Sequence, residues 1–204
     1  CARRGHFVVV RGREGMYQIH GGDRESYRER YSREPLDFSA NLNPFGVSES
    51  VRSAVIASLA DADRYPDPRC RMLRKAIGTL EGISADCIVC GNGAADLIVR
   101  LVWALRPQRA VLTAPTFSEY EKALSSVAAE IDFEVLTPED RFQLTESILT
   151  RLTPDVDLLF LCEPNNPTGV CSDRGLLCRV AEICEKHRIF FVVDECFLDF
   201  VDHP

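Results

Sequence analysis

The sequence lacks several features that would assign it to a broad functional class. No apolar run approaches the length needed to cross a membrane, so we expect no membrane partner. The formal net charge is −7 and there is no block of basic residues, which argues against nucleic acid as a partner. With 204 residues, 46% of them hydrophobic, the chain can instead bury a substantial globular core.

Lysine is scarce, and cysteine is not organised into pairs. The three lysines, Lys75, Lys122 and Lys186, lie in predicted helices among polar or charged neighbours. The nine cysteines are odd in number and scattered, and several lie in apolar runs, where a free thiol packs as a small hydrophobic group. Cys87 and Cys90 form a C-x-x-C pair without a second ligand pair, which favours a structural role. We therefore expect no metal site and a cytoplasmic location.

From residue 87 onward, strand-like and helix-like patterns alternate. The predicted strands span residues 87–90, 109–113, 131–136, 156–162 and 189–194. The predicted helices between them span residues 94–105, 117–127, 145–152 and 172–187. Two earlier helices are predicted at 48–59 and 69–80, after an irregular N-terminal arm at residues 1–46. This alternation indicates an α/β fold with a mostly parallel sheet and helices on both faces.

Two polar residues follow two of the apolar strands. Asn166 lies in a Glu-Pro-Asn-Asn-Pro-Thr-Gly segment (residues 163–169), and Asp194 ends the last predicted strand. A right-handed crossover brings the carboxyl ends of both strands to one edge of the sheet, where open α/β sheets bind ligands. Taken singly, Asn166 could belong to a turn and Asp194 to a helix cap or ion pair. The apolar flank of Asp194 makes an unpaired carboxylate costly, so we expect a cationic partner such as a protonated heterocycle nitrogen.

A glycine-rich turn, residues 91–96, follows the strand predicted at 87–90 and opens the next helix. Glycines allow a tight turn, and the free N–H groups of a first helical turn form an anion site. A dinucleotide site would need a third glycine where Asp96 stands and an acidic residue at the end of the next strand, and both are missing. We interpret the turn as holding a single phosphate group, with an ordinary turn as the alternative.

The phosphate turn, Asn166 and Asp194 occur in an order that resembles the fold-type I enzymes that use pyridoxal 5′-phosphate (PLP), in the class I/II aminotransferase group. The resemblance implies a three-layer PLP-binding large domain. It also implies that Gly93, Ala94 and Ala95 hold the cofactor phosphate, that Asn166 donates to the phenolic oxygen O3′, and that Asp194 pairs with the pyridine N–H. A protonated pyridine is a better electron sink, which agrees with a carboxylate at that position.

The resemblance assigns roles to further residues. Phe117, which could also be an ordinary core residue, would stack on the cofactor face. Tyr65 would cross the interface of a homodimer to reach the partner's cofactor phosphate. Asn41 and Asn43 would belong to an arm segment that closes over the substrate.

Within this group, the chain is most similar to threonine-phosphate decarboxylases of cobalamin biosynthesis. The resemblance is carried by His20-Gly21-Gly22, by the Asp-Phe-Ser-Ala-Asn segment at residues 37–41, and by the Asp-Glu-Cys-Phe-Leu-Asp-Phe segment at residues 194–200. It implies decarboxylation of L-threonine O-3-phosphate to (R)-1-amino-2-propanol phosphate, with His20, Gly21 and Asn41 contacting substrate. The related histidinol-phosphate aminotransferases usually have Tyr where Phe197 stands, so O3′ would here depend on Asn166 alone. An aminotransferase of that kind is the alternative enzyme.

The chain departs from the family in lacking two groups. No Lys follows Asp194 in a strand-end Ser-x-x-Lys arrangement, although the family needs such a Lys to bond to the cofactor. The Arg that binds substrate carboxylate, from a C-terminal small domain, is also missing. We therefore expect residues 47–204 to be the N-terminal part of a large domain that is incomplete at its C-terminus, and the fragment alone to be inactive. A non-catalytic scaffold or dimerisation protein is the alternative of another class.

Overall fold

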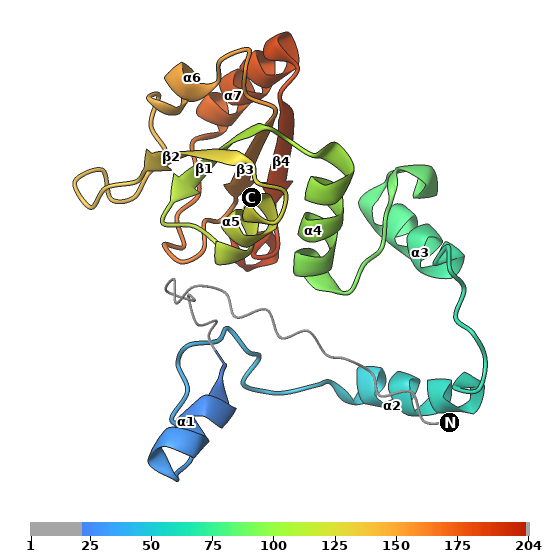
Figure 1. Ribbon diagram of the computed structural model, residues 1–204. Helices are drawn as coiled ribbons and strands as arrows, with labels where there is room; N and C mark the ends of the chain where they lie inside the picture. Colours follow the sequence, from blue (N-terminus) through green and yellow to red (C-terminus); the bar gives the residue numbers. More distant parts are fainter. Residues whose placement is uncertain (1–21, 203–204) are drawn as a thin grey trace, which may run out of the picture. The chain divides into compact units, whose positions relative to one another are not determined.

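The computed structural model describes residues 22–202. The chain divides into two compact units, residues 1–66 and 67–204, which are described separately. The first unit contains α1 (Arg24–Tyr31) and α2 (Glu49–Ser58), followed by a 3₁₀ turn at Leu59–Asp61 (Figure 1). The division into arm and large domain at residue 46 stays a prediction.

Helix α1 was not predicted, because its segment has no apolar periodicity. The Asp23 carboxylate caps its first turn by accepting the Ser26 N–H at 3.0 Å. On its surface Arg28 pairs with Glu25 and Glu34. No described residue of α1 is buried. A helix of this kind depends on caps and short-range ion pairs, which a search for apolar periodicity does not detect.

The second unit contains a four-stranded sheet and five α-helices. The helices are α3 (Arg71–Glu81), α4 (Gly93–Leu105), α5 (Ser118–Ser125), α6 (Ile148–Arg151) and α7 (Arg174–His187). The strands are β1 (Arg109–Ala114), β2 (Glu130–Val135), β3 (Leu158–Cys162) and β4 (Phe190–Asp194). Their order is β2-β1-β3-β4 and every pairing is parallel, which confirms the predicted sheet. Within residues 22–202, no helix is long and apolar enough to span a membrane.

The strand predicted at residues 87–90 is wrong. Ala85–Cys87 forms a 3₁₀ turn, and residues 88–90 pair with no strand of the described chain. Side chains from neighbouring helices bind the carbonyls there: Arg74 donates to Ala85 O at 2.6 and 2.9 Å, and Arg100 donates to Cys90 O at 3.1 Å. The Cys90 carbonyl, within the predicted strand, and the Ala85 carbonyl, just before it, therefore have arginine side chains rather than a strand as partners.

Helices cover both faces of the sheet (Figure 1). Helices α6 and α7 pack on one face with Leu159 and Leu161 of β3. Helices α4 and α5 pack on the other with Leu158, Phe160 and Cys162 of the same strand. Successive side chains of β3 thus enter opposite clusters, as expected for a strand that is buried on both faces. The predicted three-layer architecture is confirmed.

We expect Leu112→Ala to lower the free energy of unfolding by about 3 kcal/mol, since it empties a fully buried position. Leu112 is 0% exposed and lies in β1, between β2 and β3. Leu42→Ala is the matched control, because that leucine is 77% exposed and should change stability by less than about 0.5 kcal/mol. Urea unfolding midpoints measure both values, and equal losses would contradict the assignment of Leu112 to the core.

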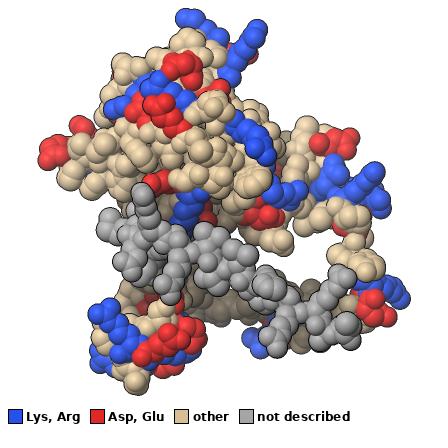
Figure 2. Space-filling view, viewed as in Figure 1, with Lys and Arg blue, Asp and Glu red and all other residues tan. Residues whose placement is uncertain are grey.

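On the face that Figure 2 shows, acidic and basic side chains of the second unit are mixed rather than separated by sign. Arg151 of α6 donates to Asp132 of β2 at 2.8 Å and also pairs with Glu134, which is 6% exposed. Glu134, and to a lesser extent Asp132, raises the pKa of Arg151 above its usual value. Arg109 of β1 pairs with Asp132 at 3.4 Å. These pairs connect α6 to the edge of the sheet formed by β1 and β2.

The chain leaves adjacent strands β1 and β3 toward opposite faces of the sheet. After β1 it enters α5, which packs with α4 on one face, and after β3 it enters α7 on the other face. Such a divergence leaves a crevice at the carboxyl ends of the two strands, which is the usual ligand site of an open α/β sheet. The two diverging loops carry Phe117 and Asn166.

Candidate functional site

The loops after β1 and β3 are joined by Asn165, a residue to which the sequence analysis gave no role. Its side chain is 7% exposed and makes three hydrogen bonds. Asn165 Oδ1 accepts from Thr116 Oγ1 at 3.1 Å, while Nδ2 donates to Pro115 O and to Thr168 Oγ1, both at 3.0 Å. Asn165 therefore fixes the loop that leads into α5 against the loop that carries Asn166.

Asn166 and Asp194 both lie beside Cys162, the last residue of β3. Cys162 is opposite Asp194 in the parallel register of β3 and β4. The Cys162 thiol, which donates to Pro164 O at 3.3 Å, lies close to the backbone N–H of Asn166, and burial raises its pKa. Asn166 is half-buried in the turn that follows β3. The structure thus brings the two predicted residues to the same sheet edge, while their roles toward a ligand stay predictions.

The half-buried Asp194 carboxylate is held by two neutral donors. Tyr120 Oη donates to Asp194 Oδ2 at 2.7 Å, and the Cys196 N–H donates to Oδ1 at 3.1 Å. Within residues 22–202, no lysine, arginine or histidine forms an ion pair with this carboxylate. Each oxygen keeps a further lone pair, so the site can also accept from a ligand donor.

The sequence analysis missed Tyr120, which connects the aromatic residue of the site to its carboxylate. Its side chain is 0% exposed and stacks on Phe160, with centroids 4.8 Å apart and planes 9° apart. It also meets Phe117 edge to face at 5.6 Å. Residues three apart in a helix face the same side, so the spacing from Phe117 was the available indication.

The glycine-rich turn leaves the start of α4 open and without a side-chain cap. Gly93 has φ +81°, and a Cβ there would meet no atom within 4 Å. Gly91 is needed for packing, since its Cβ would lie 2.8 Å from Asp96 Oδ2. Asp96 accepts the Asn92 N–H at 2.9 Å, whereas the Asn92 side chain caps nothing. The first-turn N–H groups of α4, from Gly93 onward, therefore have no side-chain acceptor from the N-cap residue.

The remaining two predicted phosphate residues, Ala94 and Ala95, lie in the first turn of α4. Ala94 packs against the core cluster that contains Tyr120, and Phe117 packs against the same cluster. Helix α4 also packs directly on α5. The glycine-rich turn and the aromatic pair Phe117 and Tyr120 are therefore parts of one packed assembly on this face of the sheet.

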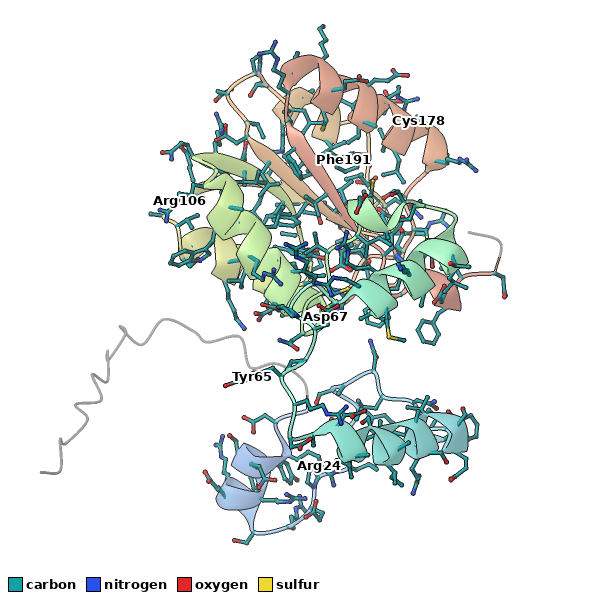
Figure 3. All side chains as sticks on the ribbon, turned by 90° about the vertical axis from the view of Figure 1, so that its right-hand side faces the viewer. Arg24, Tyr65, Asp67, Arg106, Cys178 and Phe191 are labelled. Atoms are coloured by element: carbon teal, nitrogen blue, oxygen red, sulfur yellow. The ribbon has the colours of Figure 1, made fainter. Side chains whose placement is uncertain are left out.

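Four of the predicted site residues lie in the first unit, and two of them, Tyr65 and Asn41, are among the described residues. Tyr65 is fully exposed, and its side chain extends away from the ribbon in Figure 3. Asn41 is also exposed. Their predicted contacts with a partner's cofactor and with substrate stay predictions.

The other two predicted substrate contacts, His20 and Gly21, lie outside the described residues. Their neighbour Gly22 is described, and its N–H donates to Ser39 Oγ at 2.8 Å. A Cβ on Gly22 would also lie 3.6 Å from the Ala40 Cβ. Gly22 is therefore next to the segment that ends at Asn41.

The three lysines lie on exposed helical faces, as predicted. Lys75 is in α3, Lys122 in α5 and Lys186 in α7. Lys122 pairs with Glu119 at 2.7 Å, one turn away on the same helix. Within the described chain, no lysine lies at the carboxyl end of a strand.

Comparison with known proteins assigns the chain to a family. The model for the family described as aminotransferase class I and II matches residues 33–204. The chain belongs to this family. Among curated proteins, the threonine-phosphate decarboxylase of Salmonella typhimurium is 43% identical over 82% of this chain and 46% of its own length. Histidinol-phosphate aminotransferase 2 of Archaeoglobus fulgidus is 31% identical over 83% of this chain and 48% of its own.

Solved structures of aminotransferases share the fold. The histidinol-phosphate aminotransferase from Clostridium acetobutylicum superimposes with a TM-score of 0.73 at 26% identity, covering 81% of this chain and 48% of that one. This class I/II chain spans about half the length of the curated relatives it matches.

Proposed function

We propose that the full-length protein containing this chain is a PLP-dependent enzyme that decarboxylates L-threonine O-3-phosphate to (R)-1-amino-2-propanol phosphate. The observation that carries the proposal is the 43% identity to a threonine-phosphate decarboxylase, against 31% and 34% to two histidinol-phosphate aminotransferases over a similar share of the chain. Family membership by itself supports either activity.

The described residues fit PLP at both ends of the cofactor. The open space at Gly93 and the N–H groups of the first α4 turn suit a phosphate dianion. The half-buried Asp194 carboxylate, held by neutral donors, suits a protonated pyridine nitrogen. When bound, PLP would supply the electron sink for the electron pair released at the substrate carbon.

Six residues of the chain would then hold the cofactor. Gly93, Ala94 and Ala95 would bind the phosphate through backbone N–H groups. The Phe117 ring would cover one face of the cofactor ring, and the Asn166 amide would donate to O3′. Asp194 would hold the proton on the pyridine nitrogen. The bonding lysine and the arginine for the substrate carboxylate would come from the rest of the full-length protein.

The first unit would serve the substrate side and the partner subunit. We propose a cytoplasmic homodimer in which Tyr65 reaches the partner's cofactor phosphate, while His20, Gly21 and Asn41 contact substrate. Exposed apolar side chains along and just after α2 support a surface that is covered in an assembly. These side chains, each more than half exposed, are Val51, Val55, Ile56 and Leu59.

Two assays of the full-length protein test the proposed reaction. With PLP and L-threonine O-3-phosphate, we expect release of CO₂ and formation of an aminopropanol phosphate. With PLP, histidinol phosphate and 2-oxoglutarate, we expect no formation of glutamate. Glutamate without CO₂ would replace the proposal by an aminotransferase, which the similarity to histidinol-phosphate aminotransferases would then explain. Neither product, together with no PLP binding, would indicate a non-catalytic scaffold.

We expect Gly93→Ala to weaken PLP binding by the full-length protein about tenfold, because a φ of +81° is unfavourable for alanine and the turn must move. The matched control is Gly82→Ala at the end of α3, where φ is +68° and a Cβ would also meet nothing within 4 Å. Both variants should lose about 1 kcal/mol of stability. Equilibrium dialysis with PLP measures the difference, and equal affinities in the two variants would remove the turn from the phosphate site.

A further inference from the structure

We propose that Tyr120 is a positioning residue: its hydroxyl fixes the Asp194 carboxylate in the orientation that receives the N–H of the cofactor pyridine. The proposal rests on the proposed PLP function and adds a residue that does not itself touch the cofactor. It follows from the contacts that Asp194 makes at the end of β4.

The two oxygens of Asp194 are tied from different directions. Oδ2 accepts from Tyr120 Oη at 2.7 Å, and Oδ1 accepts from the Cys196 N–H at 3.1 Å. The backbone is held as well, since the Asp194 carbonyl accepts the Glu163 N–H at 2.9 Å. A carboxylate with both oxygens bound cannot rotate freely about its Cβ–Cγ bond, so its remaining lone pairs keep a fixed direction.

Packing holds Tyr120 in place. Its ring is fully buried and contacts the parallel ring of Phe160 at 4.8 Å and the edge-on ring of Phe117 at 5.6 Å. Burial, with the adjacent Cys162 and Asp194, raises the pKa of its phenol far above the usual value, so the hydroxyl stays protonated and can donate. A donor held in this way fixes the position of the carboxylate relative to the core.

The contacts of Tyr120 also connect two of the predicted cofactor residues, Phe117 and Asp194. Phe117 would cover the face of the cofactor ring, and Asp194 would bind its nitrogen. Tyr120 contacts both, one through its ring and one through its hydroxyl. Tyr120 therefore fixes the position of Phe117, which would cover the cofactor ring, relative to Asp194, which would bind the ring nitrogen.

A purely structural role is the competing explanation, because any buried tyrosine hydroxyl needs a partner. The two roles differ in what they predict for the ring nitrogen. If Tyr120 only fills the core, its loss weakens binding of any PLP-shaped ligand equally. If it positions Asp194, its loss weakens only the interaction with the nitrogen.

The test compares PLP with its carbocyclic analogue, in which C–H replaces the pyridine nitrogen, in the full-length protein. The dissociation constants of both ligands are measured by equilibrium dialysis for the wild type and for Tyr120→Phe. The aldehyde and phosphate are common to the two ligands, so the ratio of the constants isolates the nitrogen contact. We expect the wild type to prefer PLP and Tyr120→Phe to lose about tenfold of that preference, the size of a hydrogen bond to a charged group.

Tyr31→Phe is the matched control, since that tyrosine is half exposed on α1, and it should keep the wild-type preference. If Tyr120→Phe is unfolded, 4-aminophenylalanine at position 120 keeps the size and a weaker donor, and should give an intermediate preference. An unchanged or increased preference for PLP in the folded Tyr120 variant would overturn the inference alone. A wild type that does not bind PLP would overturn the proposed function and the inference with it.

Discussion

Replacing Asp194 with alanine should lower kcat/KM of the full-length protein by about three orders of magnitude, the size expected when a preorganised charge at the reacting system is lost. The carboxylate is the proposed partner of the pyridine nitrogen, and without it the nitrogen loses its proton near neutral pH. An unprotonated ring accepts electrons poorly, so the loss should appear in kcat and not only in substrate affinity.

The fold should tolerate this change. Asp194 is half-buried at the end of the edge strand β4, and its removal leaves the Tyr120 hydroxyl and the Cys196 N–H without an acceptor. We expect a loss of about 1–3 kcal/mol, which thermal unfolding measures. Asp199→Ala is the matched control, because Asp199 is an exposed acid of the same segment.

A modified cofactor tests whether Asp194→Ala loses turnover through the lost charge on the pyridine nitrogen or through another effect of the substitution. PLP methylated on the pyridine nitrogen carries a permanent positive charge and needs no carboxylate to keep it. It should restore part of the turnover of Asp194→Ala and none of a variant damaged elsewhere. Wild-type rates in Asp194→Ala with ordinary PLP would refute the role assigned to this residue.

The sheet was predictable because its strands are apolar runs separated by helical patterns. Residues 109–113, 156–162 and 189–194 were predicted as strands, and β1, β3 and β4 occupy those segments within a few residues. The same criterion failed at residues 87–90, which pair with no strand of the described chain and where Arg100 binds the Cys90 carbonyl. Apolar character predicted neither pairing nor burial here, since Cys87 is exposed and Val89 is 67% exposed.

The convergence of two site residues was predictable because each is a polar residue that ends or follows a strand. Asn166 and Asp194 follow β3 and end β4, so their convergence follows from a parallel crossover alone. Asn165 and Tyr120 were missed because their partners are distant in sequence: Thr116 lies 49 residues from Asn165, and Asp194 lies 74 residues from Tyr120. An asparagine next to a proline is otherwise indistinguishable from an ordinary turn residue.

Replacing Asn165 should therefore mainly lower stability, whereas replacing the adjacent Asn166 should mainly lower turnover. Asn165→Leu keeps the size of a buried side chain but leaves Thr116, Thr168 and the Pro115 carbonyl without their partner. We expect a loss of about 2–4 kcal/mol in the free energy of unfolding, since polar groups at a nearly buried position lose their hydrogen bonds. Asn166→Ala should cost less than about 1 kcal/mol, because its side chain is only half-buried.

For turnover the order should be reversed, with the direct defect in Asn166→Ala. Because Phe197 carries no donor, Asn166 is the proposed source of the side-chain hydrogen bond to O3′, and its loss should lower kcat/KM at least about tenfold in a protein of normal stability. At a temperature where Asn165→Leu is still folded, its defect should lie mainly in PLP affinity, since the loops carrying Phe117 and Asn166 are no longer fixed to each other. Unfolding curves, PLP titrations and rates of both variants make this comparison. Equal stability of the two variants would refute the role of Asn165 in joining the two loops. Wild-type turnover of Asn166→Ala would refute the contact with O3′.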